Sequence, residues 1–210
     1  MLARVQRGLE ALYRIDTGVD VADFMIDETA RDGLAPQRRP REQLLVCEAG
    51  DELSLALFVD RAALDNLATH DPGRTLGDHN LGDFLLAVEG VSHFIYAICC
   101  ARAERPVTQL ELELQAEVDK YVTCLLATEP EAQVSASLRA RLYGDAIYEP
   151  DLDGDERARY RVANDNAQRY AAWLEAAFVV PRRIPEMLAA VRWFYRQGLA
   201  AKLATIARAA

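Results

Sequence analysis

The chain has 210 residues, of which 51% are hydrophobic and 27% are charged, and its formal net charge is −9. This composition is too apolar for a disordered protein and too charged for a membrane protein. The length suits one domain, or at most two small ones. Phosphate groups repel a surface this acidic, so we expect no nucleic-acid partner.

The N-terminal and the most apolar segments both favour a soluble, cytoplasmic protein. Arg4 and Arg7 interrupt the first ten residues, which therefore do not read as a secretory signal. The apolar segment 84–101 has Glu89 and His93 in its middle, and such groups are costly in a bilayer, so we expect no membrane insertion. The basic residues are 22 arginines and two lysines, which suggests a bacterial source with GC-rich coding. The cysteines, without C-x-x-C spacing, are expected to be buried thiols in a reducing compartment; they are Cys47, Cys99, Cys100 and Cys124.

Apolar residues recur at helical spacing along most of the chain, and this pattern predicts a mainly α protein. Residues 28–42 are polar, contain Arg38, Arg39 and Arg41 together with Pro36 and Pro40, and are predicted to be a loop. An acidic linker is predicted at 145–154. The predicted helices cover about 2–14, a short helix after Asp20 as N-cap, 61–69, 80–104, 106–128, 130–143, a helix capped by Asp153 or Asp155 that ends near 178, 185–197 and 199–208.

The segment 43–59 departs from the helical period and is predicted to be a β-hairpin. Residues 43–49 and 52–59 flank Gly50-Asp51, a pair typical of a two-residue II′ turn. This turn would pair Val46 with Leu55 and so place the apolar side chains on one face. Because two strands are marginal alone, the hairpin must pack on helices or pair with strands of another chain. A homo-oligomer is therefore left open.

The fold class expected is a helical bundle around a long antiparallel helical hairpin at about 80–128, decorated by the β-hairpin at about 43–59. Arg105-Pro106 makes the connection between the two long helices very short, so they should lie side by side. The whole chain, 1–210, is expected to be a single domain. The alternative is a small N-terminal α+β lobe, 1–70, on a helical body, 79–210.

A cluster of polar side chains inside the helical hairpin is the main candidate site. The helix 80–104 is apolar on nearly every side, so Glu89 and His93, one turn apart, should be at least partly buried. The register of the hairpin brings Glu117 level with His93, with Glu113 one turn away. We interpret these residues as a buried polar network, with a metal or catalytic site as the alternative. Helix-bundle metal centres use Glu-x-x-His on two helices, whereas this chain has Glu-x-x-x-His once, so no metal or cofactor is predicted.

The C-terminal segment is a second candidate. Residues 181–210 contain six basic residues and one acid, a formal charge of +5 on a chain that is otherwise −14. Arg192 and Arg196 flank Trp193, a combination that suits an acidic protein partner. The alternative is an amphipathic helix whose arginines pair with the protein's own acids.

The function predicted first is that of a non-enzymatic helical protein, an adaptor or accessory subunit that binds a partner protein. The basis is the lack of G-x-G-x-x-G, G-x-x-x-x-G-K-[ST], G-x-S-x-G and H-E-x-x-H motifs. The alternative is a metal- or ligand-binding protein, or an enzyme, that uses the Glu/His cluster. A third hypothesis is a small-ligand receptor with its pocket between helices. Whether the protein is an enzyme stays open.

Overall fold

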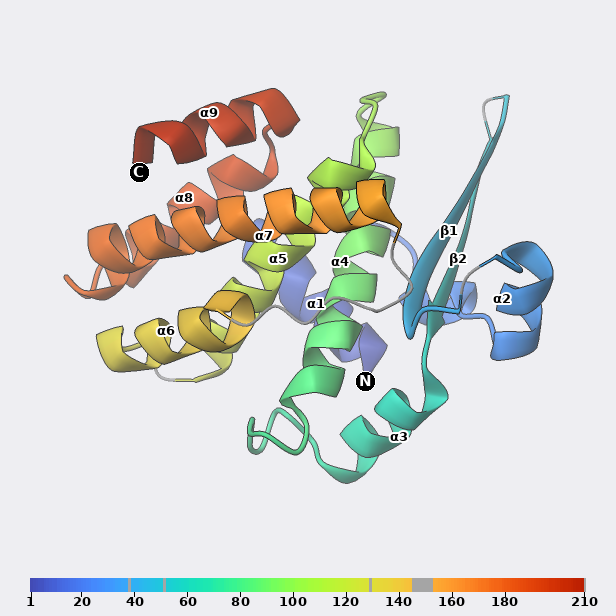
Figure 1. Cartoon of the computed structure of the whole chain (residues 1–210), viewed down its shortest axis with the longest axis horizontal. Helices are drawn as coiled ribbons and strands as arrows, with labels where there is room; N and C mark the ends of the chain where they lie inside the picture. The colour runs from blue at the N-terminus through green and yellow to red at the C-terminus, as the bar shows by residue number, and fades with distance from the viewer. Residues whose placement is uncertain (38, 51, 129, 145–152, 210) are drawn as a thin grey trace. The chain divides into compact units, whose positions relative to one another are not determined.

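The computed structural model describes residues 1–37, 39–50, 52–128, 130–144 and 153–209 (Figure 1). The structure is 68% helical and contains a two-stranded antiparallel sheet, which confirms the predicted mainly α class with one β-hairpin. The elements are α1 (Leu2–Tyr13), the 3-10 turn η1 (Val21–Phe24), α2 (Glu28–Leu34), β1 (Glu42–Ala49), β2 (Glu52–Val59), α3 (Arg61–Thr69), α4 (Leu81–Arg102), α5 (Gln109–Ala127), α6 (Ala132–Arg139), the π-helical turn η2 (Ala140–Gly144), α7 (Gly154–Leu174), the π-helical turn η3 (Glu175–Val179), α8 (Ile184–Tyr195) and α9 (Leu199–Ala209).

Two compact units make up the chain. Unit 1 comprises residues 1–10 and 15–106, and unit 2 comprises residues 11–14 and 107–210. The expected single domain, and the alternative of an N-terminal lobe on a helical body, stay predictions.

The β-hairpin of unit 1 has the predicted register. Leu44 pairs with Leu57 and Val46 with Leu55, and both strands pack against α4. Gly50 has a φ of +62°, the positive value that the predicted turn requires, while Asp51 lies outside the described residues. The hairpin therefore packs on a helix of its own unit. This is one of the two arrangements expected to stabilise it, the other being pairing with strands of another chain.

Gly90 lets the hairpin approach α4 closely. A Cβ atom at this position would lie 3.0 Å from Cγ of Glu42 and 3.2 Å from Cδ1 of Leu57. A backbone hydrogen bond also reaches β2 from the segment before α2, because the N–H of Ile26 donates to the carbonyl of Leu57 at 3.0 Å. This contact ties the segment before α2 to β2.

The predicted loop at 28–42 is wrong over its first half, where the chain forms α2. The Asp27 side chain accepts a hydrogen bond from the N–H of Ala30 and caps the helix. Thr29 and Gly33 are poor helix formers, so helix propensity gave no signal there. A tertiary contact fixes the helix instead, because Arg31 is only 2% exposed.

Other predicted boundaries are also corrected. The helix expected from 106 begins after Thr108, whose hydroxyl accepts a hydrogen bond from the N–H of Glu111. The helix expected over 130–143 ends as the π-helical turn η2. The predicted acidic linker lies outside the described residues from 145 to 152, and Asp153 caps α7 in a capping box with Glu156.

Helix α4 is long and apolar enough to span a membrane by length and composition alone. Its most apolar window is 72% buried within the structure, as expected of a core helix. A burial this high is consistent with a soluble protein. Among the cysteines, Cys100 and Cys124 are buried and Cys99 is half-buried, but Cys47 is exposed on β1, contrary to the prediction.

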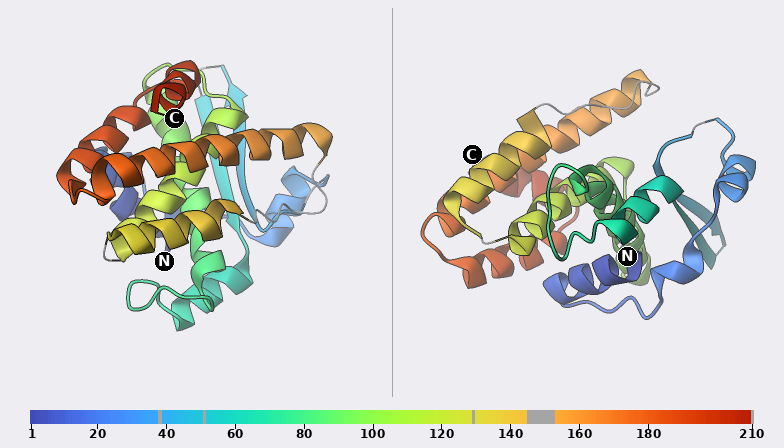
Figure 2. Two further views of the ribbon diagram at one scale, coloured as in Figure 1. Left: turned by 60° about the vertical axis from the view of Figure 1, so that its left-hand side comes forward. Right: turned by 90° about the horizontal axis from the view of Figure 1, so that it is seen from below.

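Unit 2 is held together by aromatic side chains from α1, α7 and α8. The rings of Tyr13 and Tyr195 stack with centroids 3.9 Å apart, and those of Tyr170 and Phe194 stack at 4.1 Å. Helices α6 and α7 run side by side (Figure 2). Because Tyr13 stacks on Tyr195, the last turn of α1 belongs to the core of this unit.

A group of polar contacts joins α6 to η3. Arg139 donates two hydrogen bonds to the carboxylate of Glu175, at 2.8 and 3.1 Å, and the buried Ser135 hydroxyl donates a third. Desolvation raises the pKa of Glu175, but the hydrogen bonds from Arg139 and Ser135 outweigh it and the pKa is lowered. The carboxylate thus stays charged beside its arginine.

Candidate functional site

Unit 1 contains a pocket of about 1040 Å³. Small-molecule sites typically measure roughly 300–1,000 Å³, so this pocket is large enough for a metabolite. Its walls come from the start of α1, the segment from η1 to α2, residues 39–41, the end of β2, and α3. The lining residues are Met1, Leu2, Ala3, Arg4, Arg7, Ala22, Met25, Ile26, Asp27, Glu28, Arg31, Arg39, Pro40, Arg41, Phe58, Val59, Asp60, Arg61, Leu64, Leu67, Ala68 and Asp71.

One face of α3 lines the pocket from the first residue of the helix to its last turn. Arg61, Leu64, Leu67 and Ala68 share this face because they are three to four residues apart. A helix of this length extends for about 13 Å, at 1.5 Å per residue. The lining residues therefore extend from the first residue of α3 to Asp71, just past its end.

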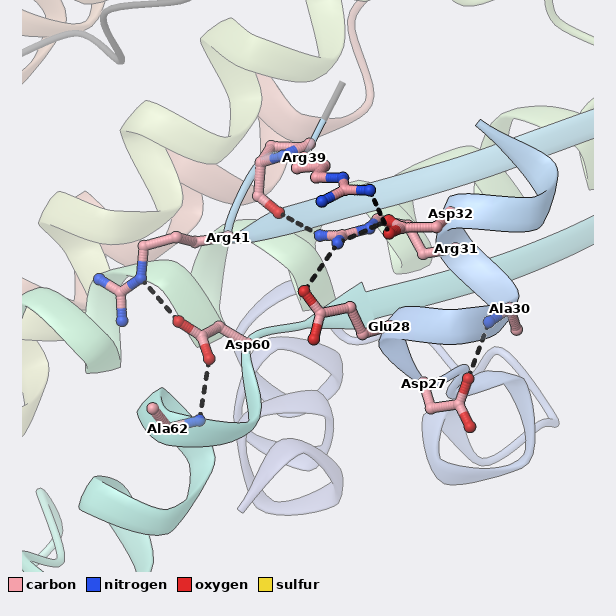
Figure 3. A network of polar contacts seen from close by, with 10 residues as sticks. Asp27, Glu28, Ala30, Arg31, Asp32, Arg39, Arg41, Asp60 and Ala62 are labelled. Atoms are coloured by element: carbon pink, nitrogen blue, oxygen red, sulfur yellow. Dashed lines mark hydrogen bonds and ion pairs between the residues drawn. The ribbon is translucent and has the colours of Figure 1, made fainter. Parts of the chain in front are cut away.

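Arg31 is the buried arginine of the site (Figure 3). Its guanidinium carbon lies 4.2 Å from the ring centroid of Phe58, and Nη1 donates to the carbonyl of Pro40 at 3.0 Å. Nε donates to Asp32 at 2.8 Å, and Nη2 donates to Glu28 at 3.2 Å. These contacts fix α2 against the end of β2 and hold one positive charge in the wall.

Arg41 marks the end of the pocket where α3 begins. Its Nε donates to Asp60 at 2.9 Å and its Nη2 donates to Asp83 at 2.8 Å. Asp60 also caps α3 by accepting from the N–H of Ala62 at 2.9 Å (Figure 3). The hydrogen bond from Arg41 is the main reason that the pKa of Asp60 is lowered.

Arg4 marks the opposite end, where α3 has ended. Its guanidinium donates two hydrogen bonds to Asp71, and these, with one from the N–H of Gly73, lower the pKa of Asp71 to about 2. Arg7 lies one turn further along α1. In the part of the chain that the structure describes, the Arg7 guanidinium has no ion pair or hydrogen bond.

The pocket lining has more arginines than carboxylates, although three acids that are not lining residues, Asp32, Asp65 and Asp83, pair with four of these arginines. Six arginines and four carboxylates line it, a formal charge of +2. Arg39 is 73% exposed and pairs with Asp32 at 3.1 Å, and Arg61 is 86% exposed and pairs with Asp65 at 2.8 Å. Exposed ion pairs of this kind contribute only about 0–1 kcal/mol, so their guanidinium groups can turn to a carboxylate or phosphate of a ligand.

Two residues of the predicted Glu/His cluster, Glu89 and His93, lie in unit 1. His93 is buried, as expected, and its ligand atoms lie within 4.8 Å of those of Glu89. Its Nδ1 is 3.6 Å from Oε1 of Glu42 on β1, a carboxylate that the sequence reasoning did not name. The side chains of His93 and Glu42 are 8% and 7% exposed. Within unit 1, the histidine thus lies between an acid of its own helix and an acid of the hairpin.

Glu113 and Glu117 lie on α5 in unit 2. Glu113 is buried, and Glu117 is half-buried with its carboxylate 2.6 Å from the Lys120 ammonium. The carbonyl of Glu117 accepts a hydrogen bond from the Tyr143 hydroxyl at 3.0 Å. The predicted meeting of these acids with Glu89 and His93 stays a prediction.

The predicted partner-binding residues lie on and just after α8. Trp193 is 50% exposed. Arg192 donates to the carbonyl of Leu12 at 2.6 Å and Arg196 to that of Tyr13 at 3.0 Å, so both arginines bind the C-terminal end of α1. Lys202, which was counted with the basic segment, is fully buried and does not reach the surface.

The sequence reasoning missed the pocket. Arg39 and Arg41 were noted only as loop residues, and Arg31 was not considered. Their grouping in an acidic chain was a signal that could have found one end of the pocket. The other end comes from α1 and from Asp71, and no local pattern connects those residues to segment 28–42.

Comparison of the chain with protein families, with curated proteins and with solved structures gives no match.

Proposed function

We propose that the protein binds a small organic anion in the pocket of unit 1. The observation that supports this most directly is the grouping of six arginines around a cavity of about 1040 Å³ in a chain of net charge −9. Guanidinium groups bind carboxylates and phosphates through two parallel hydrogen bonds, and they stay charged at every physiological pH.

The apolar part of the wall supports an organic rather than an inorganic anion. Met25, Ile26, Phe58, Leu64 and Leu67 line the same cavity. Inorganic phosphate would leave this surface in contact with water, whereas an apolar ligand body would bury it. The protein thus acts as a receptor or carrier, which develops the small-ligand hypothesis of the sequence analysis.

Calorimetric titration with decanoate tests the proposal, with decyltrimethylammonium as the ligand of opposite charge. We expect decanoate to bind and the cation not to bind. The double variant Arg7→Gln/Arg39→Gln removes one exposed arginine from each end of the pocket and should weaken decanoate binding by about tenfold or more. The matched control is Arg157→Gln/Arg169→Gln, which removes two exposed arginines from α7 in unit 2.

Equal binding of decanoate by the two double variants would contradict the proposal. The same conclusion would follow if the cation bound as well as the anion. Circular dichroism and the unfolding midpoint of each variant establish that the fold is retained before binding is compared.

Binding of a partner protein through Arg192, Trp193 and Arg196 stays a second proposal. The observation that favours it is the half-exposed indole of Trp193, because exposed tryptophans are enriched in protein interfaces. We also propose that the protein is cytoplasmic, as expected from the sequence.

A further inference from the structure

We infer that the ligand of the pocket is a linear dianion, with an anionic group at each end and an apolar chain between them. This inference rests on the proposed function and adds the chemical class of the ligand. It follows from the positions of the arginines along α3 and from the residues that separate them.

The first anionic subsite lies where α3 begins. Arg41 binds Asp60, the N-cap residue of α3, and the charge of Arg31 also lowers the pKa of Asp60. Arg39 pairs with Asp32, which also binds Arg31 (Figure 3). Arg41 and Arg39 are 51% and 73% exposed, so a ligand can reach their guanidinium groups.

The second anionic subsite lies where α3 has ended. Arg4 binds Asp71, two residues past the last residue of α3, and Arg7 is on the adjacent turn of α1. Residues three apart on a helix lie on the same side, so both guanidinium groups can point to one ligand group. The two subsites are therefore separated by about the length of α3, roughly 13 Å at 1.5 Å per residue.

The wall between the two subsites is apolar. Leu64 and Leu67 come from α3, and Met25 and Ile26 come from the segment before α2. A methylene chain laid along these side chains loses its contact with water, which strengthens binding by about fourfold for each buried methylene group. A second charge placed halfway along the ligand would meet no arginine.

Each subsite has arginines that an anionic group can bind. The subsite at the start of α3 has Arg31, Arg39, Arg41 and Arg61 among the lining residues, with Asp27, Glu28 and Asp60. The subsite at the end has Arg4 and Arg7 with Asp71. Each group of lining residues has a formal charge of +1. At the start of α3, three acids outside the lining also pair with these arginines, so an anionic group binds there by replacing a carboxylate partner of an exposed arginine.

Calorimetric titration with α,ω-dicarboxylates of increasing length tests the inference on the full-length protein. Succinate, suberate, sebacate and dodecanedioate form the series. We expect affinity to rise with length to an optimum at sebacate or dodecanedioate. Sebacate should also bind about tenfold more tightly than decanoate, which has as many carbons and one carboxylate fewer.

Two single variants at opposite ends supply the second part of the test. Arg7→Gln and Arg39→Gln should each lower the affinity for sebacate by about tenfold, and the control Arg169→Gln should leave it unchanged. Neither arginine is buried, so both variants should fold, and their unfolding midpoints verify this.

The failure of this inference and the failure of the proposed function give different results. If decanoate binds as tightly as sebacate, or if only one of the two end variants weakens sebacate, the dianion inference is overturned while anion binding stands. If neither ligand binds in a way that depends on the arginines, the proposed function itself is overturned.

Discussion

The ammonium group of Lys202 donates a hydrogen bond to Oε1 of Gln115 over 2.6 Å, and both side chains are fully buried in unit 2. Gln115 in turn donates to Oδ1 of Asp119 at 2.7 Å, and the Tyr13 hydroxyl donates to the same oxygen. The amide thus connects a buried cation to a buried carboxylate. This arrangement joins α9 to α5 and to the last turn of α1.

Replacing Lys202 with Met should lower the free energy of unfolding by about 3 kcal/mol. The reason is that loss of one charge leaves the other buried without compensation, which typically costs about 3–5 kcal/mol, while the methionine keeps the apolar stem packed. Urea unfolding followed by circular dichroism measures the change. The double variant Lys202→Met/Asp119→Asn removes both charges and should be at least about 1 kcal/mol more stable than the sum of the single effects implies. Strict additivity would show that the two charges are not coupled.

Four buried tyrosines should resist alkaline titration. Burial is the main cause that raises the pKa values of Tyr13, Tyr121, Tyr143 and Tyr170, that of Tyr121 to about 12. In the unfolded chain these phenols lose their protons near pH 10, whereas in the folded chain they keep them. The free energy of unfolding should therefore fall as the pH rises above about 10.

Phenolate absorbance measures this titration directly. The native protein should show a late transition that coincides with loss of the helical signal, and the urea-unfolded protein should show a single transition near pH 10 for its eight tyrosines. Superimposable native and unfolded curves would rule out the buried environment described for these four rings.

The contact between His93 and Glu42 should contribute to the stability of unit 1. Their facing atoms are 3.6 Å apart and both side chains are almost fully buried. His93→Ala should lower the free energy of unfolding by about 1–3 kcal/mol, because a buried polar group loses its partner. The control Ser54→Ala changes an exposed residue of β2 and should have an effect within about 0.5 kcal/mol. Elemental analysis separates the two interpretations of the cluster: a metal present in the wild type and lost from His93→Ala would favour the site over the structural network.

Gly50 and Gly8 should respond to substitution in opposite directions. Gly50 has a φ of +62°, so Gly50→Val should destabilise the hairpin by about 1–3 kcal/mol. Gly8 lies inside α1, where an added Cβ atom would point into open space, so Gly8→Ala should stabilise by about 0.5–1 kcal/mol. Thermal unfolding compares the two variants with the wild type. A Gly50→Val protein with an unchanged midpoint would mean that the turn does not need a positive φ.

The elements set by local patterns could be predicted from the sequence. The hairpin register followed from the two-residue turn at Gly50-Asp51, and α3 followed from Asp60 as its N-cap, since both signals lie within a few residues. Helix α2 depends on the burial of Arg31 against Phe58, which is distant in the chain. No local pattern reveals such a contact, and the loop expected there was wrong.

The candidate site could be predicted even less, for the same physical reason. The pocket is assembled from α1, the segment around α2, residues 39–41 and α3, and its charge is a property of their arrangement. The burial of His93 was predicted because its helix is apolar on nearly all sides. The burial of Lys202 was not, since the charge of a segment does not show which basic side chains find buried partners.

Trp193 and its flanking arginines should have separable roles. Arg192 and Arg196 bind carbonyl oxygens at the end of α1, so Arg192→Glu and Arg196→Glu would each place a carboxylate against a carbonyl and should lower the stability of unit 2 by about 1–3 kcal/mol. Trp193 is half-exposed, and Trp193→Ala should change stability far less. Thermal unfolding measures all three variants.

Partner capture then tests the docking proposal through Trp193, because this variant leaves the fold intact. Proteins retained by the immobilised wild type, and identified by mass spectrometry, should be lost with Trp193→Ala, since truncating an interface tryptophan costs about 2 kcal/mol or more, a factor of roughly 30 in affinity. The binding should also weaken with salt if the partner is acidic. Trp193→Phe is the matched control, because it keeps an aromatic ring at the same position. A partner retained equally by Trp193→Ala and Trp193→Phe would show that this surface of α8 is not where it binds.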